Sequence, residues 1–314
     1  MNEASPASVP PDLASTYVPA DRTGFLAGPG ARLRYALWNA AGTPRGTAIV
    51  LQGRAEFIEK YATETVGELR TRGFAVAAID LRGQGLSDRP LTDRNKGHVD
   101  DFSTFVADLR LFLEAIVAMG LPQPFLALSH STGGNVLLRL LAERGARPLS
   151  RAVFVSPMTG LPRTGLLEAA IAVASPFGIR DDEYMLATGP YDLKHRRFAT
   201  NDVTTDERRY RFTDSWFAAD RRLVLGGPTI GWLRQGLRSI DRLDEPGVLE
   251  RIDLPVMVVS TLSDRVVDPA SHARATERIR GANLVMIEGA KHEILMETDA
   301  RLAAFWSAFD KFAA

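Results

Sequence analysis

The chain contains no cysteine. Disulfide bridges, thiolate metal sites and cysteine nucleophiles are therefore excluded, and the absence is compatible with a reducing cytoplasm. A surplus of either charge is also missing, because 38 basic residues balance 38 acidic residues among 314. A dedicated nucleic-acid-binding protein would show a basic surplus, so this balance argues against that class.

Long apolar segments are lacking as well. No stretch approaches the run of about 18 apolar residues that a membrane-spanning helix requires. The first residues read MNEASPASVPPDLASTYVPADR, which has neither the basic start nor the apolar centre of a signal peptide. We therefore expect a cytoplasmic protein with no membrane span, for which any membrane contact would be peripheral and on the inner face.

Short apolar runs alternate with helical patterns over most of the chain. The apolar runs predict buried strands, and the segments with helical spacing predict helices between them. The predicted strands are 47–51, 74–80, 124–129, 152–156, 256–260 and 284–288, and the predicted helices are 57–72, 102–119, 133–144, 269–280 and 300–312. This alternation predicts an α/β fold with a mostly parallel central sheet and helices on both faces.

Two segments depart from the alternation. Residues 1–20 are rich in Pro, Ser and Ala, and we expect them to form an extended N-terminal arm. Residues 157–245 contain clustered Arg and two of the four Trp, and they predict a helical cap, or lid, inserted between two parts of the core, 21–156 and 246–314. Ligands of open α/β sheets bind beyond the carboxyl ends of the strands, so the substrate-binding residues are expected to include residues of the cap.

The sequence FLALSHSTGG, residues 125–134, places a serine between a predicted strand and a predicted helix. This arrangement is typical of a nucleophile elbow, in which a sharp turn lifts the serine hydroxyl clear of the sheet. Small neighbours are needed because the strand and the helix approach closely, and Gly133 and Gly134 supply them. Ser129 stands where the motif usually has glycine. We predict that Ser131 is the nucleophile.

A serine hydroxyl needs a base, and the base is commonly a histidine held by an acid. The expected order is serine, acid, histidine, with the last two after later strands. His292 follows the strand predicted at 284–288, and Asp264 follows the strand at 256–260. Asp268 is a rival acid, but it precedes Pro269 and is more typical of a helix N-cap.

The other histidines fit these positions less well. His98, His195 and His272 follow no predicted strand, and the side chain of His130 is expected to point away from the hydroxyl of the next residue. No group of His, Asp and Glu has the spacing of metal ligands, so no metal is expected.

An oxyanion hole requires two backbone N–H donors. The amide after the nucleophile, that of Thr132, is one candidate. The loop LQGRAE, residues 51–56, supplies the other, because Gly53 would allow the backbone to direct the Arg54 amide towards Ser131. The Arg54 guanidinium would remain free for other work. The glycine-rich segment DLRGQGLSD, residues 80–88, lacks phosphate-loop spacing, and we interpret it as a structural turn below the site.

Several motifs together resemble one branch of the α/β-hydrolases. The segments LQGRAEFIEKY, IDLRGQGLSDR, KGHVDDF, HSTGG, SPM, SDRVVD and GAKHEIL are similar to those of the lysophospholipase and monoacylglycerol lipase group, also classified as serine aminopeptidase S33-type hydrolases. The resemblance extends from about residue 30 to the C-terminus. It departs from the group at Gln52, where His is usual, and at Ser129, where Gly is usual.

The resemblance implies a catalytic triad of Ser131, Asp264 and His292, with main-chain oxyanion donors at Arg54 and Thr132. It also implies an α/β-hydrolase fold and hydrolysis of a small-molecule, lipid-like acyl ester held under the cap. No cofactor is required for this chemistry. Two alternatives stay open at this point: a peptidase or amidase on the same scaffold, and a ligand-binding protein that has the fold without the activity.

Overall fold

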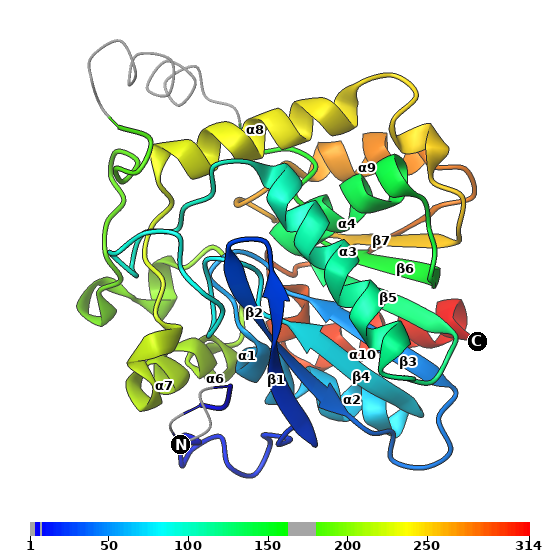
Figure 1. Ribbon diagram of the computed structural model, residues 1–314, viewed down its shortest axis with the longest axis horizontal. Helices are drawn as coiled ribbons and strands as arrows, with labels where there is room; N and C mark the ends of the chain where they lie inside the picture. The colour runs from blue at the N-terminus through cyan, green and yellow to red at the C-terminus, as the bar shows by residue number, and fades with distance from the viewer. Residues whose placement is uncertain (1–3, 7, 163–179) are drawn as a thin grey trace.

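The computed structural model describes residues 4–6, 8–162 and 180–314. Within them, one eight-stranded sheet has the order β1-β2-β4-β3-β5-β6-β7-β8 (Figure 1). The strands are β1 (Arg22–Gly28), β2 (Ala31–Trp38), β3 (Gly46–Leu51), β4 (Phe74–Ile79), β5 (Phe125–His130), β6 (Leu149–Val155), β7 (Val256–Ser260) and β8 (Asn283–Met286). β2 is antiparallel to both of its neighbours, and all other pairs are parallel.

Helices cover both faces of this sheet (Figure 1). The α-helices are α1 (Ile58–Ala62), α2 (Thr65–Thr71), α3 (Phe102–Ala118), α4 (Ser131–Arg144), α6 (Glu207–Tyr210), α7 (Phe212–Ala219), α8 (Ile230–Asp244), α9 (Pro269–Arg278) and α10 (Asp299–Ala313). The short 3₁₀ helices are η1 (Leu193–His195), η2 (Phe198–Thr200), η3 (Arg221–Leu223), η4 (Leu249–Arg251) and η5 (Ile294–Met296). One apolar core lies beneath α3, α4, α8 and α9, and a second beneath α1, α2 and α10.

The predicted mostly parallel sheet with helices on both faces is confirmed, with two differences in its elements. The helix predicted at 57–72 is two helices, because the chain leaves helical geometry at Glu64, where φ is −141°. The hairpin of β1 and β2 was not predicted. A signal for its second strand is present, since ARLRYALW alternates polar and apolar residues over its first half, although the structure buries Arg34 as well as the apolar residues.

Between β6 and β7, the described part of the predicted cap contains short helices and the longer helix α8. Residues 163–179 of that cap lie outside the described residues. α8 packs against α3 and α4 through Trp232 and Ile240, which belong to the same core as the sheet. This contact places one side of the 157–245 segment directly over the helix that begins at Ser131.

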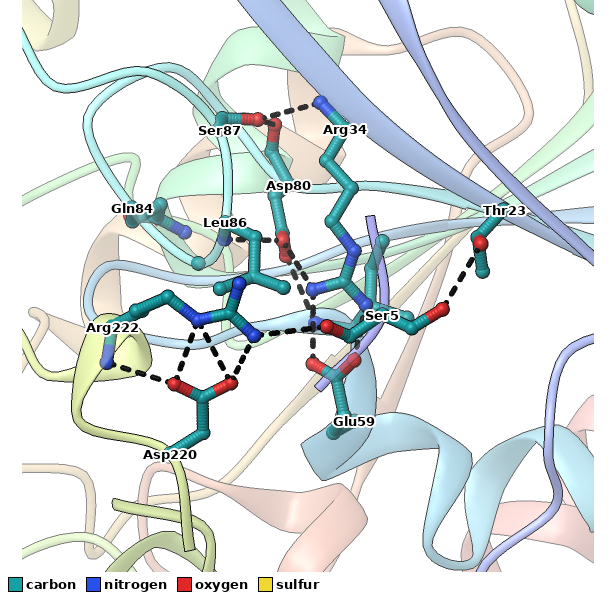
Figure 2. A network of polar contacts seen from close by, with 12 residues as sticks. Ser5, Thr23, Arg34, Glu59, Asp80, Gln84, Leu86, Ser87, Asp220 and Arg222 are labelled. Atoms are coloured by element: carbon teal, nitrogen blue, oxygen red, sulfur yellow. Dashed lines mark hydrogen bonds and ion pairs between the residues drawn. The ribbon is translucent and has the colours of Figure 1, made fainter. Parts of the chain in front are cut away.

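The N-terminal residues lie against the body of the protein. Leu13 is buried in an apolar cluster with Phe57 and Trp216. Figure 2 shows a polar contact of the same segment, in which Arg222 donates a hydrogen bond to the backbone oxygen of Ser5 over 2.9 Å. The expected arm therefore contacts the 157–245 segment as well as the core.

Candidate active site

Ser131 occupies a sharp turn between β5 and α4. Its φ angle is +49°, in the left-handed region that residues other than glycine rarely adopt. The glycines that follow make this turn sterically feasible. A Cβ on Gly133 would lie 2.6 Å from the backbone oxygen of Gln52, and a Cβ on Gly134 would lie 2.8 Å from Cβ of Pro157. The strained serine and its close backbone neighbours together match the geometry of a nucleophile elbow.

The unusual Ser129 is accommodated by a hydrogen bond. Its hydroxyl donates to the backbone oxygen of Val153 on the adjacent strand β6, over 3.2 Å. The residue is buried, so an unpaired hydroxyl here would be destabilising. The larger side chain thus remains compatible with the elbow without disturbing Ser131.

The structure brings together the three residues predicted to form a triad. Nε2 of His292 lies 3.0 Å from Oγ of Ser131, and Nδ1 of His292 lies 2.7 Å from Oδ2 of Asp264. His292 follows β8 and Asp264 follows β7, so each side chain comes from a loop beyond the carboxyl end of a parallel strand. All three residues are buried. The histidine can accept the serine proton on one nitrogen while the carboxylate holds its other N–H.

Asp264 is held as a carboxylate by its surroundings. Burial disfavours its charge, but the hydrogen bond and charge of His292 and the amides of Val266 and Val267 outweigh that effect, and the pKa of Asp264 is lowered. The two amides donate to Oδ1 over 2.8 and 3.0 Å. The rival Asp268 caps α9 instead, because its Oδ1 accepts a hydrogen bond from the amide of Ala270. Its prediction as an N-cap is confirmed.

The loop that carries Arg54 passes close to the nucleophile. A Cβ on Gly53 would lie 3.1 Å from Cβ of Ser131 and 2.8 Å from Nδ1 of His130. Gly53 is therefore required by close approach. The residue of this loop with a left-handed backbone is Ala55, where φ is +61°. Within the described residues, neither the Arg54 amide nor the Thr132 amide donates a hydrogen bond to another protein group. As far as the described part of the chain shows, both predicted oxyanion donors are available to a ligand.

Gln84 fixes this loop from below. Its Nε2 donates to the backbone oxygens of Gly53 and Glu56, over 2.8 and 3.1 Å. Its Oε1 accepts from the amide of Ala55 over 3.3 Å. The three bonds are made to residues on both sides of Arg54. The segment 80–88, interpreted above as a structural turn, therefore holds the loop that is predicted to supply an oxyanion donor.

Asp80 ties the same segment to the start of α1 (Figure 2). It accepts hydrogen bonds from the amides of Ile58 and Leu86, over 2.9 and 2.8 Å. Arg34 lies between Asp80 and Glu59 and pairs with both carboxylates. Burial and the charge of Glu59 raise the pKa of Asp80 to about 6, although Arg34 opposes this shift. This buried group anchors the backbone on both sides of Gln84.

A second buried charge cluster lies beside the candidate triad. Glu56 accepts hydrogen bonds from the Gly53 amide over 2.5 Å, from Lys60 over 2.8 Å and from the Tyr61 hydroxyl over 2.7 Å. Lys60 also pairs with Glu293 over 2.8 Å. Burial opposes the charge of Glu56, but Lys60 and His130 outweigh it and hold the pKa of this carboxyl well below its usual range.

His130 belongs to this cluster and points away from the serine hydroxyl, as expected. Its Nδ1 lies 3.0 Å from a carboxylate oxygen of Glu56, and its Nε2 lies 3.2 Å from the backbone oxygen of His292. Both partners accept hydrogen bonds, so a protonated ring, with an N–H on each nitrogen, would satisfy both of them. Burial opposes this charge, but Glu56 and Glu293 raise the pKa of His130.

The remaining histidines lie outside the triad. Nδ1 of His272 lies 2.6 Å from the Ser260 hydroxyl, and its Nε2 lies 2.9 Å from the backbone oxygen of Pro157. Burial lowers the pKa of His272 to about 4, so this ring is neutral. His98 contacts the hydroxyl of Thr229 over 2.8 Å. His195 lies in η1, far along the chain from each of the loops that carry the triad.

Glu56, Lys60 and Gln84 contribute to the site but were not predicted from the sequence. Their partners are 28 or more residues away in several cases, and no local pattern identifies such pairs. In the described ranges, no group of three or more His, Asp or Glu residues could hold a metal ion. A search of the same ranges finds no helix that is long and apolar enough to cross a membrane.

Comparison with known proteins places this geometry in context. A family model described as serine aminopeptidase, S33, matches residues 42–299. The chain is 30% identical to lysophospholipase L2 of Escherichia coli K12, over 80% of this chain and 75% of that protein. It is 28% identical to a probable lysophospholipase L2 of Haemophilus influenzae, over 81% of this chain and 79% of that protein. A crystal structure of a monoglyceride lipase from Saccharomyces cerevisiae is similar in fold, with a TM-score of 0.74 at 19% identity, over 95% of this chain and 96% of that one.

Proposed function

The chain belongs to the serine aminopeptidase S33 family of α/β-hydrolases, and we propose that this carboxylic ester hydrolase acts through an acyl-enzyme formed on Ser131. The observation that carries the proposal is the hydrogen-bonded series from Ser131 through His292 to Asp264, at 3.0 and 2.7 Å. Such a series converts a weakly nucleophilic hydroxyl into an effective one.

The reaction follows from these contacts in two halves. Nε2 of His292 takes the proton of Ser131 as Oγ bonds to the ester carbonyl carbon. The amides of Arg54 and Thr132 stabilise the oxyanion, and His292 then protonates the leaving alcohol as its C–O bond breaks. In the second half, His292 deprotonates a water molecule, which attacks the acyl carbon. The acid leaves, and Ser131 recovers its proton.

The substrate that we propose is a lipid-like monoacyl ester, such as a lysophospholipid or a monoacylglycerol. The names of the relatives and of the structural neighbour support this class. We also propose that residues 157–245 form a cap over the acyl chain. Trp232 and Met158 support this arrangement, since Trp232 is a buried residue of α8, Met158 is buried beside that helix, and Met158 accepts a hydrogen bond from the Thr132 hydroxyl at 3.8 Å.

Replacement of the nucleophile tests the proposal. Ser131→Ala should abolish hydrolysis of short p-nitrophenyl esters, with a melting temperature no lower than that of the parent, because the substitution removes only a hydroxyl. Retained turnover would refute the assignment. A fluorophosphonate probe should label the parent at Ser131 and leave the variant unlabelled. Absence of label on the parent would favour a binding protein without activity.

A peptidase or amidase is a second candidate, because the matching family model is described as a serine aminopeptidase. Acyl-enzyme chemistry serves amides as well as esters, so the triad does not discriminate between them. A panel of lysophospholipids, monoacylglycerols and aminoacyl-naphthylamides would. Hydrolysis confined to the naphthylamides would replace the ester assignment with the peptidase one.

A further inference from the structure

Arg54 is a half-buried cation for which the described residues supply no acidic partner. Its Nη2 donates to the backbone oxygen of Gly226 over 2.5 Å, while its Nε is buried without a hydrogen-bond partner in the described part of the chain. Among the described residues, no carboxylate lies within ion-pair distance of it. Two buried arginines differ, since Arg34 pairs with Glu59 and Asp80, and Arg209 pairs with three carboxylates. Arg89 is similar to Arg54 in having a buried Nε without a partner among the described residues, but its other nitrogens donate to several backbone oxygens.

The surroundings of Arg54 keep the guanidinium in place without neutralising it. Its centre lies 5.4 Å from the ring centre of Trp232, within range of a cation–π contact. A Cβ on Gly97 would lie 2.5 Å from Nη2, so a larger residue there would displace the guanidinium from this position. Burial lowers the pKa of Arg54 to about 10, which leaves the group charged at neutral pH. A desolvated cation of this kind favours an anion as its missing partner.

Further groups nearby favour an anion. The hydroxyl of Tyr184 is buried and has no hydrogen-bond partner among the described residues, and it is close enough to Arg54 for their charges to interact. The ammonium of Lys96 lies 5.5 Å from the ring centre of Tyr184. Arg89 is also close enough for the charge of Arg54 to lower its pKa. Carboxylates lie near these groups as well: Glu183 pairs with Lys96, the charge of Asp93 acts on Tyr184, and that of Asp80 acts on Arg89. None of them is within ion-pair distance of the Arg54 guanidinium in the described part of the chain.

The position of Arg54 connects this group to the reaction. Its amide is one of the two proposed oxyanion donors, so the backbone from which its side chain extends would lie next to the reacting carbonyl. Trp232, on which the guanidinium lies, is near Met158, because a Cβ on Gly236 would lie 3.6 Å from Trp232 and 3.8 Å from Met158. Met158 in turn contacts the Thr132 hydroxyl. A series of neighbouring side chains, Trp232 and Met158, therefore leads from the guanidinium to Thr132, the residue of the other predicted oxyanion donor.

We propose that the Arg54 guanidinium, with the Tyr184 hydroxyl beside it, binds an anionic group on the alcohol part of the substrate. A phosphate ester or a carboxylate suits the planar guanidinium, which can donate two parallel hydrogen bonds to either. This inference rests on the proposed ester hydrolysis and adds a selection rule to it: anionic monoacyl esters react faster than neutral ones with the same acyl chain.

Three substrates with one acyl chain test the rule. They are 1-decanoylglycerol, 1-decanoylglycerol 3-phosphate and the decanoyl ester of glyceric acid, each used as monomers. The parent should show a higher kcat/KM for the anionic esters than for the neutral one, and the larger of the two ratios identifies the preferred anion. Arg54→Met should lower that ratio about 10- to 100-fold, as expected for loss of a charge-assisted hydrogen bond. Arg54→Lys should restore part of it.

A matched control separates the selection rule from other effects. Arg196→Met removes an arginine of the 157–245 segment that pairs with Asp214 over 3.1 Å, and it should leave the ratio unchanged. A disturbed oxyanion loop in Arg54→Met would lower kcat/KM for all three esters by one factor and leave the ratio unchanged, which would overturn the inference. Failure of the ester mechanism itself would appear separately, as p-nitrophenyl ester turnover by Ser131→Ala.

Discussion

Replacement of Gln84 tests how the loop 51–56, which carries the predicted oxyanion donor Arg54, is kept in position. Replacement by leucine keeps the side-chain size but removes the three hydrogen bonds to Gly53, Ala55 and Glu56. Each such bond contributes about 1 kcal/mol net, so the loop would lose roughly 3 kcal/mol of local stability. The bond from the Gly53 amide to the Glu56 carboxylate remains and limits the displacement.

The catalytic effect follows from the amide that this loop carries. Loss of one oxyanion donor lowers kcat by about 100- to 1000-fold in a serine protease. Because the loop in Gln84→Leu is loosened but keeps one anchor, we expect kcat to fall by about 10- to 100-fold, with a smaller change in KM. A trifluoromethyl ketone, which forms an oxyanion on Ser131, should lose affinity by a similar factor.

The assay combines p-nitrophenyl ester kinetics, ketone inhibition and thermal unfolding. Ser87→Ala is the matched control, because Ser87 belongs to the same segment, 80–88, as Gln84. Its hydroxyl makes hydrogen bonds with the backbone of Asp80 and of Arg34, and none with residues 53–56. This control should lower the melting temperature while kcat stays within about threefold of the parent. If Gln84→Leu lowers only the melting temperature, and leaves kcat and ketone affinity as they are in the parent, the positioning role is refuted.

Three further predictions concern the titrating groups. Asp264→Asn should lower kcat by about 10⁴-fold in ester assays, because the amide would donate to Nδ1 of His292 and leave a proton on the nitrogen that faces Ser131. The pKa of His272 is lowered to about 4 in the folded protein, so the unfolded chain binds a proton at this residue more readily and acid destabilises the fold. This residue should lower the free energy of unfolding by about 2 kcal/mol between pH 7 and pH 4.5. In urea titrations, the stability of His272→Gln should depend on pH less than that of the parent by this amount. The pKa of His130 is raised in the folded protein, so its contribution to the free energy of unfolding is complete below pH 6.5 and is lost as the pH rises through the pKa of the folded state. Its ring signals in NMR should still be those of an imidazolium at pH 6.5, and a neutral ring would contradict the assignment.

The sequence predicted the elements whose signals are local. The strands β3 to β7 are continuous apolar runs because both of their faces are buried, and the elbow is encoded by consecutive residues around Ser131. Asp264 and His292 could be proposed because parallel strands end at one edge of the sheet. The contacts of Gln84 and Glu56 could not be proposed in this way, because they join loops that are separated by up to 74 residues and depend on register between strands.

The residues next to the predicted catalytic positions form one buried support. Gly53 precedes Arg54, His130 precedes Ser131 and Glu293 follows His292, and neighbouring residues in extended backbone point to opposite sides. The Gly53 amide and His130 both bind Glu56, and Lys60 joins Glu56 to Glu293. Two carboxylates therefore meet one ammonium and one imidazolium, a balanced set of buried charges that removes the penalty of an unpaired ion. Glu56, together with Lys60, thus connects the three loops that carry the predicted oxyanion donor, nucleophile and base.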